Sequence, residues 1–336
     1  MYILAIESSC DDTSAAVLED DRLVLSNVVS SQFDVHARYG GIVPELASRR
    51  HIESIWPVVH SALDYAGLSL NDIDLIAATR GPGLVGSLLV GFTFAKAVAL
   101  VNNIPCVGVD HMAGHLLSAF LEDCKPQFPY IALIVSGGNT TIFEVSSFTE
   151  FRALGRTRDD AAGEAYDKVA KLLQLGYPGG PIIDKLAASG NPEAFSFPRA
   201  WLGDESLDFS FSGLKTSVLN QVNHWRQKGD ELNIPDLCCS FQSAVVEVLV
   251  EKTLRAAKQR GISSIVVGGG VGANSNLRHR MARRCEEEGY MLHLPSPVYC
   301  TDNGAMIAIA GYHAHLQGDA VMPDTDVYPR SQLNLP

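Results

Sequence analysis

The sequence predicts an α/β protein of two related lobes with a nucleotide cleft between them. Three observations support this fold class. The chain has 336 residues, more than one typical domain holds. An apolar strand, a small polar turn and a second apolar strand occur in this order twice. Strands then alternate with helices, which is typical of sheets covered on both faces.

The two predicted hairpins share one plan. The first has an apolar strand over residues 2–7 and a second strand over 15–18, with polar residues between them. The second has strands over 131–135 and 141–145 around a turn that contains two glycines. Sequence identity between the halves is low, so the repeat is one of pattern and predicts two lobes of like fold.

Further elements follow from periodicity and from the turn residues that separate them. We place lobe I at residues 1–110 and lobe II at 111–336, with an irregular insertion of short helices and loops at about 189–235. The C-terminal helix is expected to pack back on lobe I. The predicted helices cover 45–66, 84–102, 236–260, 276–288 and 303–315, and the remaining predicted strands cover 73–78, 107–109, 264–267 and 291–294.

Composition and charge narrow the class of protein. The N-terminus lacks the basic region and cleavage site of a signal peptide, and seven scattered cysteines fit a reducing compartment, so we expect a cytoplasmic protein. The longest apolar stretch, residues 84–101, is interrupted by glycine and polar residues, which favours a buried helix over a membrane span. The net charge of −12 does not support non-specific binding of nucleic acid, so an RNA partner would need a local basic face.

Glycine clusters follow several predicted strands, at 81–86, 137–138, 179–180 and 268–270. Glycine lets backbone N–H groups approach phosphate oxygens, and ligands of α/β folds sit at the carboxyl ends of strands. None of the clusters matches the G-x-x-x-x-G-K-[ST] pattern of a P-loop. The last cluster does not lead directly into a helix, which disfavours a dinucleotide-binding dehydrogenase. The clusters therefore predict a phosphate cradle of another kind.

A pair of histidines is the strongest metal signal. His111 and His115 stand four residues apart, which on a helix places both imidazoles on one side, where they can bind one metal ion. The chain has ten histidines, so the spacing alone is a modest signal. No Glu follows His111, and the H-E-x-x-H pattern of zinc proteases is absent. Asp302 is the candidate third ligand, although an Asp before a predicted helix can equally serve as its N-cap.

Acidic residues gather in one further predicted helix. Asp160, Glu164 and Asp167 fall on one helical side, at positions i, i+4 and i+7. Like charges on one side repel unless they bind cations or hydrogen-bond donors. The spacing leaves two interpretations open, ribose or metal contacts on the one hand and a solvated acidic face on the other.

Nine segments carry a resemblance to a known family. They lie, in chain order, at residues 6–13, 40–49, 81–86, 111–115, 135–138, 159–168, 177–181, 209–216 and 301–306. Together they resemble the bacterial tRNA N6-adenosine threonylcarbamoyltransferase family (TsaD), and the match extends from residue 3 to about 330. Two positions depart from the family pattern: Asn139 stands where the family usually has His, and Ala113 where it usually has Glu.

The resemblance implies the two-lobed actin/Hsp70/sugar-kinase fold, in which each lobe is ribonuclease-H-like. It implies an acyltransferase that moves L-threonylcarbamoyl from threonylcarbamoyl-AMP to N6 of the adenosine 3′ of the anticodon, in tRNAs that read codons beginning with A. It implies two protein partners: a paralogous subunit of the same fold (TsaB-like) that dimerises with lobe I, and a small P-loop ATPase (TsaE-like). No membrane partner is implied.

The resemblance also implies site residues. One divalent metal ion, Fe²⁺ in preference to Zn²⁺, is expected on His111, His115 and Asp302. Asp11 and Asp12 match acidic positions near the reaction centre and are the expected catalytic residues. The expected substrate-binding residues are Val135, Ser136, Gly137, Gly138, Asn139, Asp167, Gly180, Asp184 and Asn274.

Two other functions remain open at this point. An ATP-dependent kinase of a small sugar or acid could share the fold, but it would need no histidine pair. A non-catalytic nucleotide-binding scaffold of a larger complex could share it too. Formation of the modified adenosine from threonylcarbamoyl-AMP and tRNA would distinguish the transferase from both.

Overall fold

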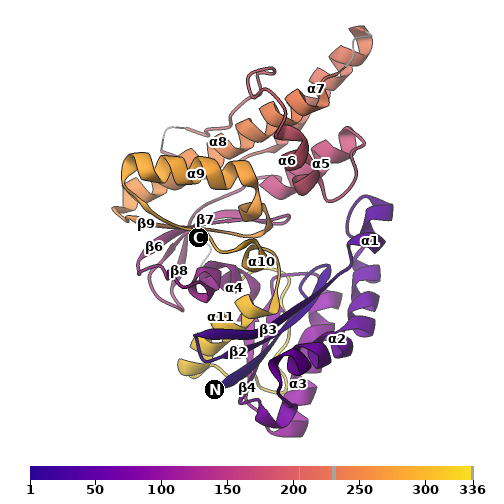
Figure 1. The fold of residues 1–336 in the computed structure, drawn as a ribbon, viewed down its shortest axis with the longest axis vertical. Coiled ribbons are helices and arrows are strands. Elements are labelled where there is room, and N and C mark those ends of the chain that lie inside the picture. Colours follow the sequence, from indigo (N-terminus) through magenta and orange to yellow (C-terminus); the bar gives the residue numbers. More distant parts are fainter. Residues whose placement is uncertain (204, 229–231, 334–336) are drawn as a thin grey trace. The chain divides into compact units, whose positions relative to one another are not determined.

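The computed structural model describes residues 1–203, 205–228 and 232–333. The chain contains two compact units and two five-stranded sheets (Figure 1). Residues 111–126 and the residues from 295 onward belong to the unit that holds the N-terminal strands. Unit 1 comprises Met1–Pro126, Val145–Arg152 and Pro295–Pro336, and unit 2 comprises Gln127–Glu144 and Ala153–Leu294.

The sheet of unit 1 has the strand order β3-β2-β1-β4-β5. β1 pairs antiparallel with β2, which pairs antiparallel with β3, whereas β1–β4 and β4–β5 are parallel pairs. The sequence analysis does not predict β3, because its apolar residues come in blocks and do not alternate with polar ones. The strands are β1 (Tyr2–Glu7), β2 (Asp12–Glu19), β3 (Leu23–Ser31), β4 (Leu75–Gly81) and β5 (Cys106–Asp110).

Helices cover both faces of this sheet. On one face Val17 shares a core with Ile55 of α2 and Phe92 of α3. Ala16 points to the opposite face, because side chains alternate along a strand, and there α11 packs so closely that a Cβ on Gly304 would lie 2.6 Å from Ala16 N. The longer helices are α2 (Pro44–Ala66), α3 (Val85–Asn102) and α11 (Gly304–Leu316), and the shorter ones are α1 (Phe33–His36), α4 (His111–Leu117) and α10 (Pro297–Cys300).

Helix α3 is buried on one side only. Phe92, Ala95 and Ala99 lie in the core, whereas Leu100 and Val101 are exposed. Among the described residues it is the one helix whose length and apolar composition would suffice to cross a membrane, a test that core helices also pass. The expectation of a buried helix therefore holds for one of its faces.

The sheet of unit 2 repeats the order of the first. Its strands are arranged β8-β7-β6-β9-β10, and β6–β9 and β9–β10 are parallel pairs like β1–β4 and β4–β5. The repeat predicted from the two hairpins is therefore confirmed, and it extends to all five strands. The strands are β6 (Tyr130–Val135), β7 (Thr140–Val145), β8 (Phe151–Arg156), β9 (Ser264–Gly268) and β10 (Met291–His293).

One helix of unit 2 corrects the sequence analysis. The segment 189–235 is predicted to hold short helices and loops, but it contains the 17-residue helix α7. Leu214, Val218 and Val222, spaced by four residues, are its buried side, and its many polar residues obscure that pattern. The helices of this unit are α5 (Ala162–Leu172), α6 (Gly179–Ala187), α7 (Ser212–Lys228), α8 (Ile234–Arg260) and α9 (Ser275–Glu288).

Candidate metal centre and nucleotide site

The structure brings His111, His115 and Asp302 together within unit 1. One ligand atom from each lies within 4.8 Å of the other two. Asp302 Oδ1 is 3.2 Å from His115 Nε2 and 3.5 Å from His111 Nε2. Both histidines are buried, and each presents the same ring nitrogen to the carboxylate. This arrangement of two imidazoles and one carboxylate is suited to a divalent metal ion.

Local sequence explains why the histidines lie there. Helix α4 begins directly after β5, and Asp110 caps it by accepting a hydrogen bond from Met112 N (2.9 Å). Gly114, between the two histidines, allows α4 to pack tightly on α11, since a Cβ at this position would lie 3.0 Å from Ile307. The histidines four residues apart are thereby held against the helix that follows Asp302.

Asp302 does not serve as the cap of that helix. The N-cap of α11 is Asn303, whose Oδ1 accepts a hydrogen bond from Met306 N (3.0 Å). The alternative in which Asp302 merely caps a helix is therefore excluded. Its carboxylate faces the two histidines instead.

The sequence analysis missed the role of Glu7, the last residue of β1. Glu7 is fully buried, and its Oε2 lies 3.0 Å from His111 Nδ1. Because a carboxylate only accepts, the proton of a neutral His111 lies on Nδ1 and the lone pair on Nε2, which faces Asp302. Carboxylates commonly orient metal-binding histidines in this way. An acidic residue that closes an otherwise apolar buried strand was the available signal.

The electrostatics of the cluster favour a cation. Burial alone would lower the pKa of His111, but the carboxylates of Glu7 and Asp302 raise it to about 9. Burial alone would raise the pKa of Asp302, yet the charge of His111 and the hydrogen bond from His115 lower it to about 2. The carboxylates thus stabilise a positive charge among them. A divalent ion on two neutral imidazoles would supply that charge, so the residues fit a metal.

Asp11 and Asp12 lie at the turn between β1 and β2. Burial raises the pKa of both, and the negative charge of Asp302 adds to it, so that the pKa of Asp12 is about 7. The turn is fixed by His51 of α2, whose Nε2 donates to Cys10 O (3.0 Å) and whose Nδ1 accepts from Thr13 Oγ1 (2.8 Å). Asp12 can therefore hold or release a proton near neutral pH from a fixed position.

The glycine turn of unit 2 follows β6, which ends at Val135. Ser136 closes the turn, because its N–H donates to Asn139 O (2.8 Å) and its Oγ accepts from Asn139 N (3.1 Å). Gly137 and Gly138 at its tip are exposed, with nothing within 4 Å of the place a Cβ would take. This open tip is where a phosphate or carboxylate can approach the backbone.

The acidic residues after β8 have partners within the chain. Asp160 precedes α5, and Lys168 Nζ bonds both Asp160 (2.6 Å) and Glu164 (2.8 Å), so these two charges are neutralised within the chain. Asp167 Oδ1 accepts from Gly179 N (2.7 Å) and joins α5 to the start of α6. Gly180, the next residue, has open space at its Cβ position.

Asp184 and Asn274 are joined through a residue that the sequence analysis missed, Gln242 of α8. Gln242 Nε2 donates to Asp184 Oδ1 (3.0 Å), and its Oε1 accepts from Asn274 Nδ2 (2.9 Å). Ser275 also donates to Asp184, from N to Oδ2 (3.0 Å) and from Oγ to Oδ1 (2.9 Å). Gln242 is 2% exposed, so the centre of this network is buried, whereas the bonds from Ser275 to Asp184 lie at the surface. A polar residue inside the long apolar pattern of α8 gave no distinct signal.

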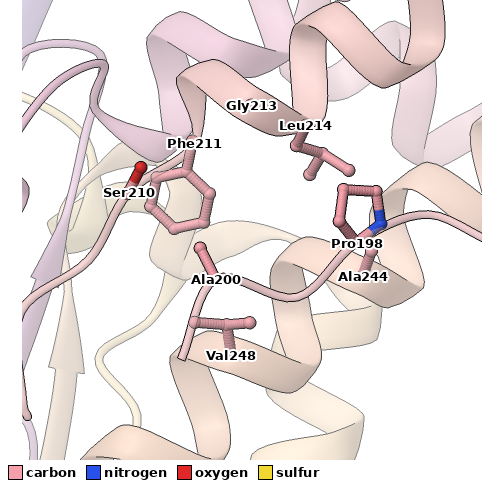
Figure 2. Close-up of a pocket in the computed structure, with 8 residues that line it drawn as sticks. All are labelled: Pro198, Ala200, Ser210, Phe211, Gly213, Leu214, Ala244 and Val248. Carbon is pink, nitrogen blue, oxygen red and sulfur yellow. The ribbon is translucent and has the colours of Figure 1, made fainter. Parts of the chain in front are cut away.

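A small cavity elsewhere in unit 2 is not part of this constellation. Side chains from the segment before α7, from α7 and from α8 surround it (Figure 2). None of the expected site residues lines it, and Ser210, the polar side chain in its wall, donates its hydroxyl to Asp159. The lining residues are Pro198, Ala200, Ser210, Phe211, Gly213, Leu214, Ala244 and Val248.

Comparison with known proteins decides the family. The family model described as tRNA N6-adenosine threonylcarbamoyltransferase matches residues 23–309. The chain belongs to the TsaD family. It is 55% identical to the tRNA N6-adenosine threonylcarbamoyltransferase of Desulfotalea psychrophila, over 99% of this chain and 98% of the relative. It is 51% identical to that of Clostridioides difficile, over 98% of each. TsaD membership confirms the resemblance and does not favour the kinase or scaffold alternatives.

Solved structures agree on the fold of this TsaD chain. A full-length HypF in its phosphate- and nucleotide-bound form has a TM-score of 0.61 at 15% identity, covering 93% of this chain and 55% of HypF. Component A of the (R)-2-hydroxyglutaryl-CoA dehydratase of Acidaminococcus fermentans has a TM-score of 0.54 at 15% identity, covering 94% and 98%. At such identities the likeness concerns the fold alone, and the predicted actin/Hsp70/sugar-kinase-like fold is confirmed.

Proposed function

We infer that this chain is an acyltransferase that transfers L-threonylcarbamoyl to N6 of an adenosine in tRNA. The acceptor is the adenosine 3′ of the anticodon in tRNAs that read codons beginning with A, and we propose threonylcarbamoyl-AMP as the donor. The observation that carries the proposal is the buried cluster of His111, His115 and Asp302, supported by Glu7, in a chain of the TsaD family.

The transfer makes one bond and breaks one. Adenine N6 bonds to the carbamoyl carbon, the bond from that carbon to the phosphate oxygen breaks, AMP leaves and N6 loses a proton. The exocyclic amine is a poor nucleophile, so positioning and polarisation of the carbonyl must supply most of the rate. We assign the proton to Asp11 or Asp12. Their fixed turn and the pKa of about 7 for Asp12 support this role.

We assign one divalent metal ion to His111, His115 and Asp302, and propose Fe²⁺ in preference to Zn²⁺. When bound, the ion would act as a Lewis acid on the threonylcarbamoyl oxygens and orient them. Glu7 would keep the proton of His111 on Nδ1, so that Nε2 remains available as a ligand. Either ion accepts two imidazoles and a carboxylate, so metal analysis of protein purified without oxygen is the test of identity.

We assign the adenylate to unit 2. The backbone amides of Gly137 and Gly138 would bind the phosphate or carboxylate, and Asp167 and Asp184 would accept from ribose hydroxyls. Asp184 already accepts two hydrogen bonds at Oδ1 and one at Oδ2, and a carboxylate offers about four such sites, so Oδ2 retains one. The other residues that we place in this site are Val135, Ser136, Asn139, Gly180 and Asn274.

We further propose two protein partners, a paralogous subunit of the same fold (TsaB-like) and a small P-loop ATPase (TsaE-like), and a cytoplasmic location. With a net charge of −12, the chain has no overall attraction for tRNA. A partner or a local basic face must therefore supply part of the affinity. This supports the assignment of the reaction to a complex.

The test is reconstitution from purified components. The chain is incubated with threonylcarbamoyl-AMP, unmodified tRNA and the two partner proteins, and the tRNA nucleosides are analysed by mass spectrometry. We expect the threonylcarbamoylated adenosine, and its loss when the metal is removed with a chelator. Absence of the modified nucleoside, together with transfer of phosphate from ATP to a small sugar or acid, would refute the proposal and support the kinase.

A further inference from the structure

The segment after α11 is ordered although its described residues, 317–333, contain no helix or strand. We call these residues the C-terminal strap. Its hydrogen bonds to the rest of unit 1 include Val321 N to Cys106 O (2.8 Å), Lys96 Nζ to Pro323 O (3.3 Å) and Thr325 O (2.8 Å), Arg80 Nε to Asp326 O (2.6 Å) and Tyr328 N to Arg80 O (3.1 Å). These bonds hold the strap along the ends of β4 and β5 and along α3.

The strap ends on one carboxylate, that of Asp110. Asp110 Oδ2 accepts hydrogen bonds from Tyr328 OH (3.0 Å), Ser331 Oγ (2.9 Å) and Gln332 N (3.3 Å). Its Oδ1 accepts from Met112 N (2.9 Å) and so caps α4. A single side chain therefore joins the C-terminal strap to the first turn of the helix that carries His111 and His115.

The ring of Tyr328 occupies a place that the sequence leaves open for it. A Cβ on Gly81 would lie 2.1 Å from Tyr328 O and 2.3 Å from a ring carbon, so only glycine fits at position 81. The guanidinium of Arg80, the residue before Gly81, lies 5.4 Å from the centroid of the Tyr328 ring and makes a cation–π contact with it. The contact is built by both partners and brings the hydroxyl to Asp110.

Helix α4 needs support from outside itself. It has seven residues, about two turns, and a helix of this length is not stable on its own. Its first residue is His111, which directly follows Asp110, so a shift of the cap moves the ligand. The strap supplies three of the four hydrogen bonds that hold the Asp110 carboxylate.

We propose that the C-terminal strap positions the metal-binding helix, with Tyr328 and Ser331 as positioning residues that act through Asp110. The inference rests on the metal site proposed above. Loss of the strap's bonds to Asp110 lets α4 move relative to Asp302 and weakens metal binding. Both side chains donate their hydrogen bonds to Asp110, so the effect on the cluster passes through this residue.

The experiment measures metal affinity in the full chain. Tyr328→Phe combined with Ser331→Ala removes two donors to Asp110 and keeps the ring against Gly81. Co²⁺ is the probe, bound in competition with a chelator and followed by its visible absorption, which reports the ligand geometry. We expect affinity to fall about tenfold, as for the loss of other partners outside the ligand set, with a changed absorption band.

The matched control is Lys96→Met, which removes the strap's bonds at Pro323 and Thr325 and leaves the bonds to Asp110 in place. Melting temperatures of the metal-free proteins measure the general loss of stability. We expect the control to lower the melting temperature as much as the double variant does, while it keeps the Co²⁺ affinity and spectrum of the unchanged chain.

The outcomes separate the two claims. Unchanged Co²⁺ affinity and spectrum in the double variant would overturn the positioning role, as would an equal loss of affinity in Lys96→Met. If the unchanged chain binds no Co²⁺, the metal site itself fails, and the strap proposal fails with it. If the single variant Ser331→Ala, which keeps Tyr328, binds Co²⁺ more tightly than the double variant, the hydrogen bond from Tyr328 to Asp110 contributes to the positioning of α4.

Discussion

Glu7 Oε2 lies 3.0 Å from His111 Nδ1, between residues 104 positions apart in the chain. This hydrogen bond fixes which nitrogen of His111 can act as a ligand. Glu7 also accepts from Thr79 Oγ1 and from Ser9 N, so it is held by its own neighbours. The first strand of the chain is in this way part of the candidate metal centre.

Glu7→Gln is expected to weaken metal binding about tenfold, since the amide keeps the shape and removes the charge that stabilises the protonated Nδ1. Chelator competition on the purified chain measures the affinity. Thr79→Val, which removes another bond to Glu7, is the comparison and should have a smaller effect. Equal affinities in Glu7→Gln and the unchanged chain would show that Glu7 only fills the core.

Asp302→Ala and Asn303→Ala change neighbouring residues with different roles. We expect Asp302→Ala to abolish bound metal and transfer activity together, because it deletes a ligand. Asn303→Ala should keep the metal and lose about 1 kcal/mol of stability, the usual cost of a deleted N-cap. Metal content by elemental analysis and urea unfolding give the two readouts. Full metal occupancy in Asp302→Ala would refute the ligand assignment.

Gln242→Leu is expected to raise KM for threonylcarbamoyl-AMP about tenfold with a smaller change in kcat. The variant removes the partner that joins Asp184 to Asn274, so that Asp184 is then held by Ser275 and Asn274 by its cap of α9. Unsatisfied polar groups should also cost about 1–3 kcal/mol of stability. Tyr166→Phe is the control, because it removes only the 3.4 Å bond to Gln242. A change confined to kcat would contradict a role in binding the donor.

His313 predicts a loss of stability in acid. Burial lowers its pKa to about 4, and its ring stacks on Phe148. The pKa of an unfolded histidine is about 6.5, so the unfolded chain binds more protons between these values. This part of the unfolding free energy is present above pH 6.5 and falls as the pH drops toward 4. Urea unfolding at several pH values measures it, and His313→Phe should fall less steeply. If the unfolding free energies of the unchanged chain and of His313→Phe fell equally with decreasing pH, His313 would be excluded as the cause of the acid destabilisation.

Binding of tRNA by the isolated chain should be weak and strongly dependent on salt, because the chain carries a net charge of −12 and any contact must be local. A filter-binding or fluorescence titration measures how steeply the affinity for tRNA falls with salt concentration. The useful range is roughly 50 to 200 mM, because phosphate contacts lose most of their affinity there. Tight binding that is insensitive to salt would contradict this expectation.

Local sequence patterns were sufficient to predict the structure where one type of residue determines it. The apolar runs of β1 and β6 predicted the strands correctly, and the i, i+4 spacing of His111 and His115 predicted two imidazoles on one side of a helix, which the structure places together. Strand β3 was missed because its apolar residues come in blocks, and helix α7 because its many polar residues obscure its apolar side. In both elements, packing against neighbouring strands and core residues decided the secondary structure, because the local sequence preference for strand or helix is weak.

The site was predictable only in its outline. Glu7 and Gln242 owe their roles to partners more than thirty positions away, which no spacing rule connects. The helical spacing of the acidic group after β8 was predicted only in part, since Asp160 lies before the helix, and the pairing of Lys168 with Asp160 and Glu164 was not predicted. Asp302 and Asn303 could not be told apart as cap and ligand until backbone geometry assigned the cap to Asn303.

The packing of α11 on the first strands has a consequence for biosynthesis. Gly304 rests against Ala16, and Asp302 stands just before this helix, near the end of the chain. Until α11 has been synthesised, the N-terminal sheet lacks the helix that packs on Ala16, and the two histidines lack the carboxylate that faces them. The cluster that we propose for the metal can therefore be completed only after residue 302 has been translated, and a chain that stops before this residue lacks the third member of the cluster.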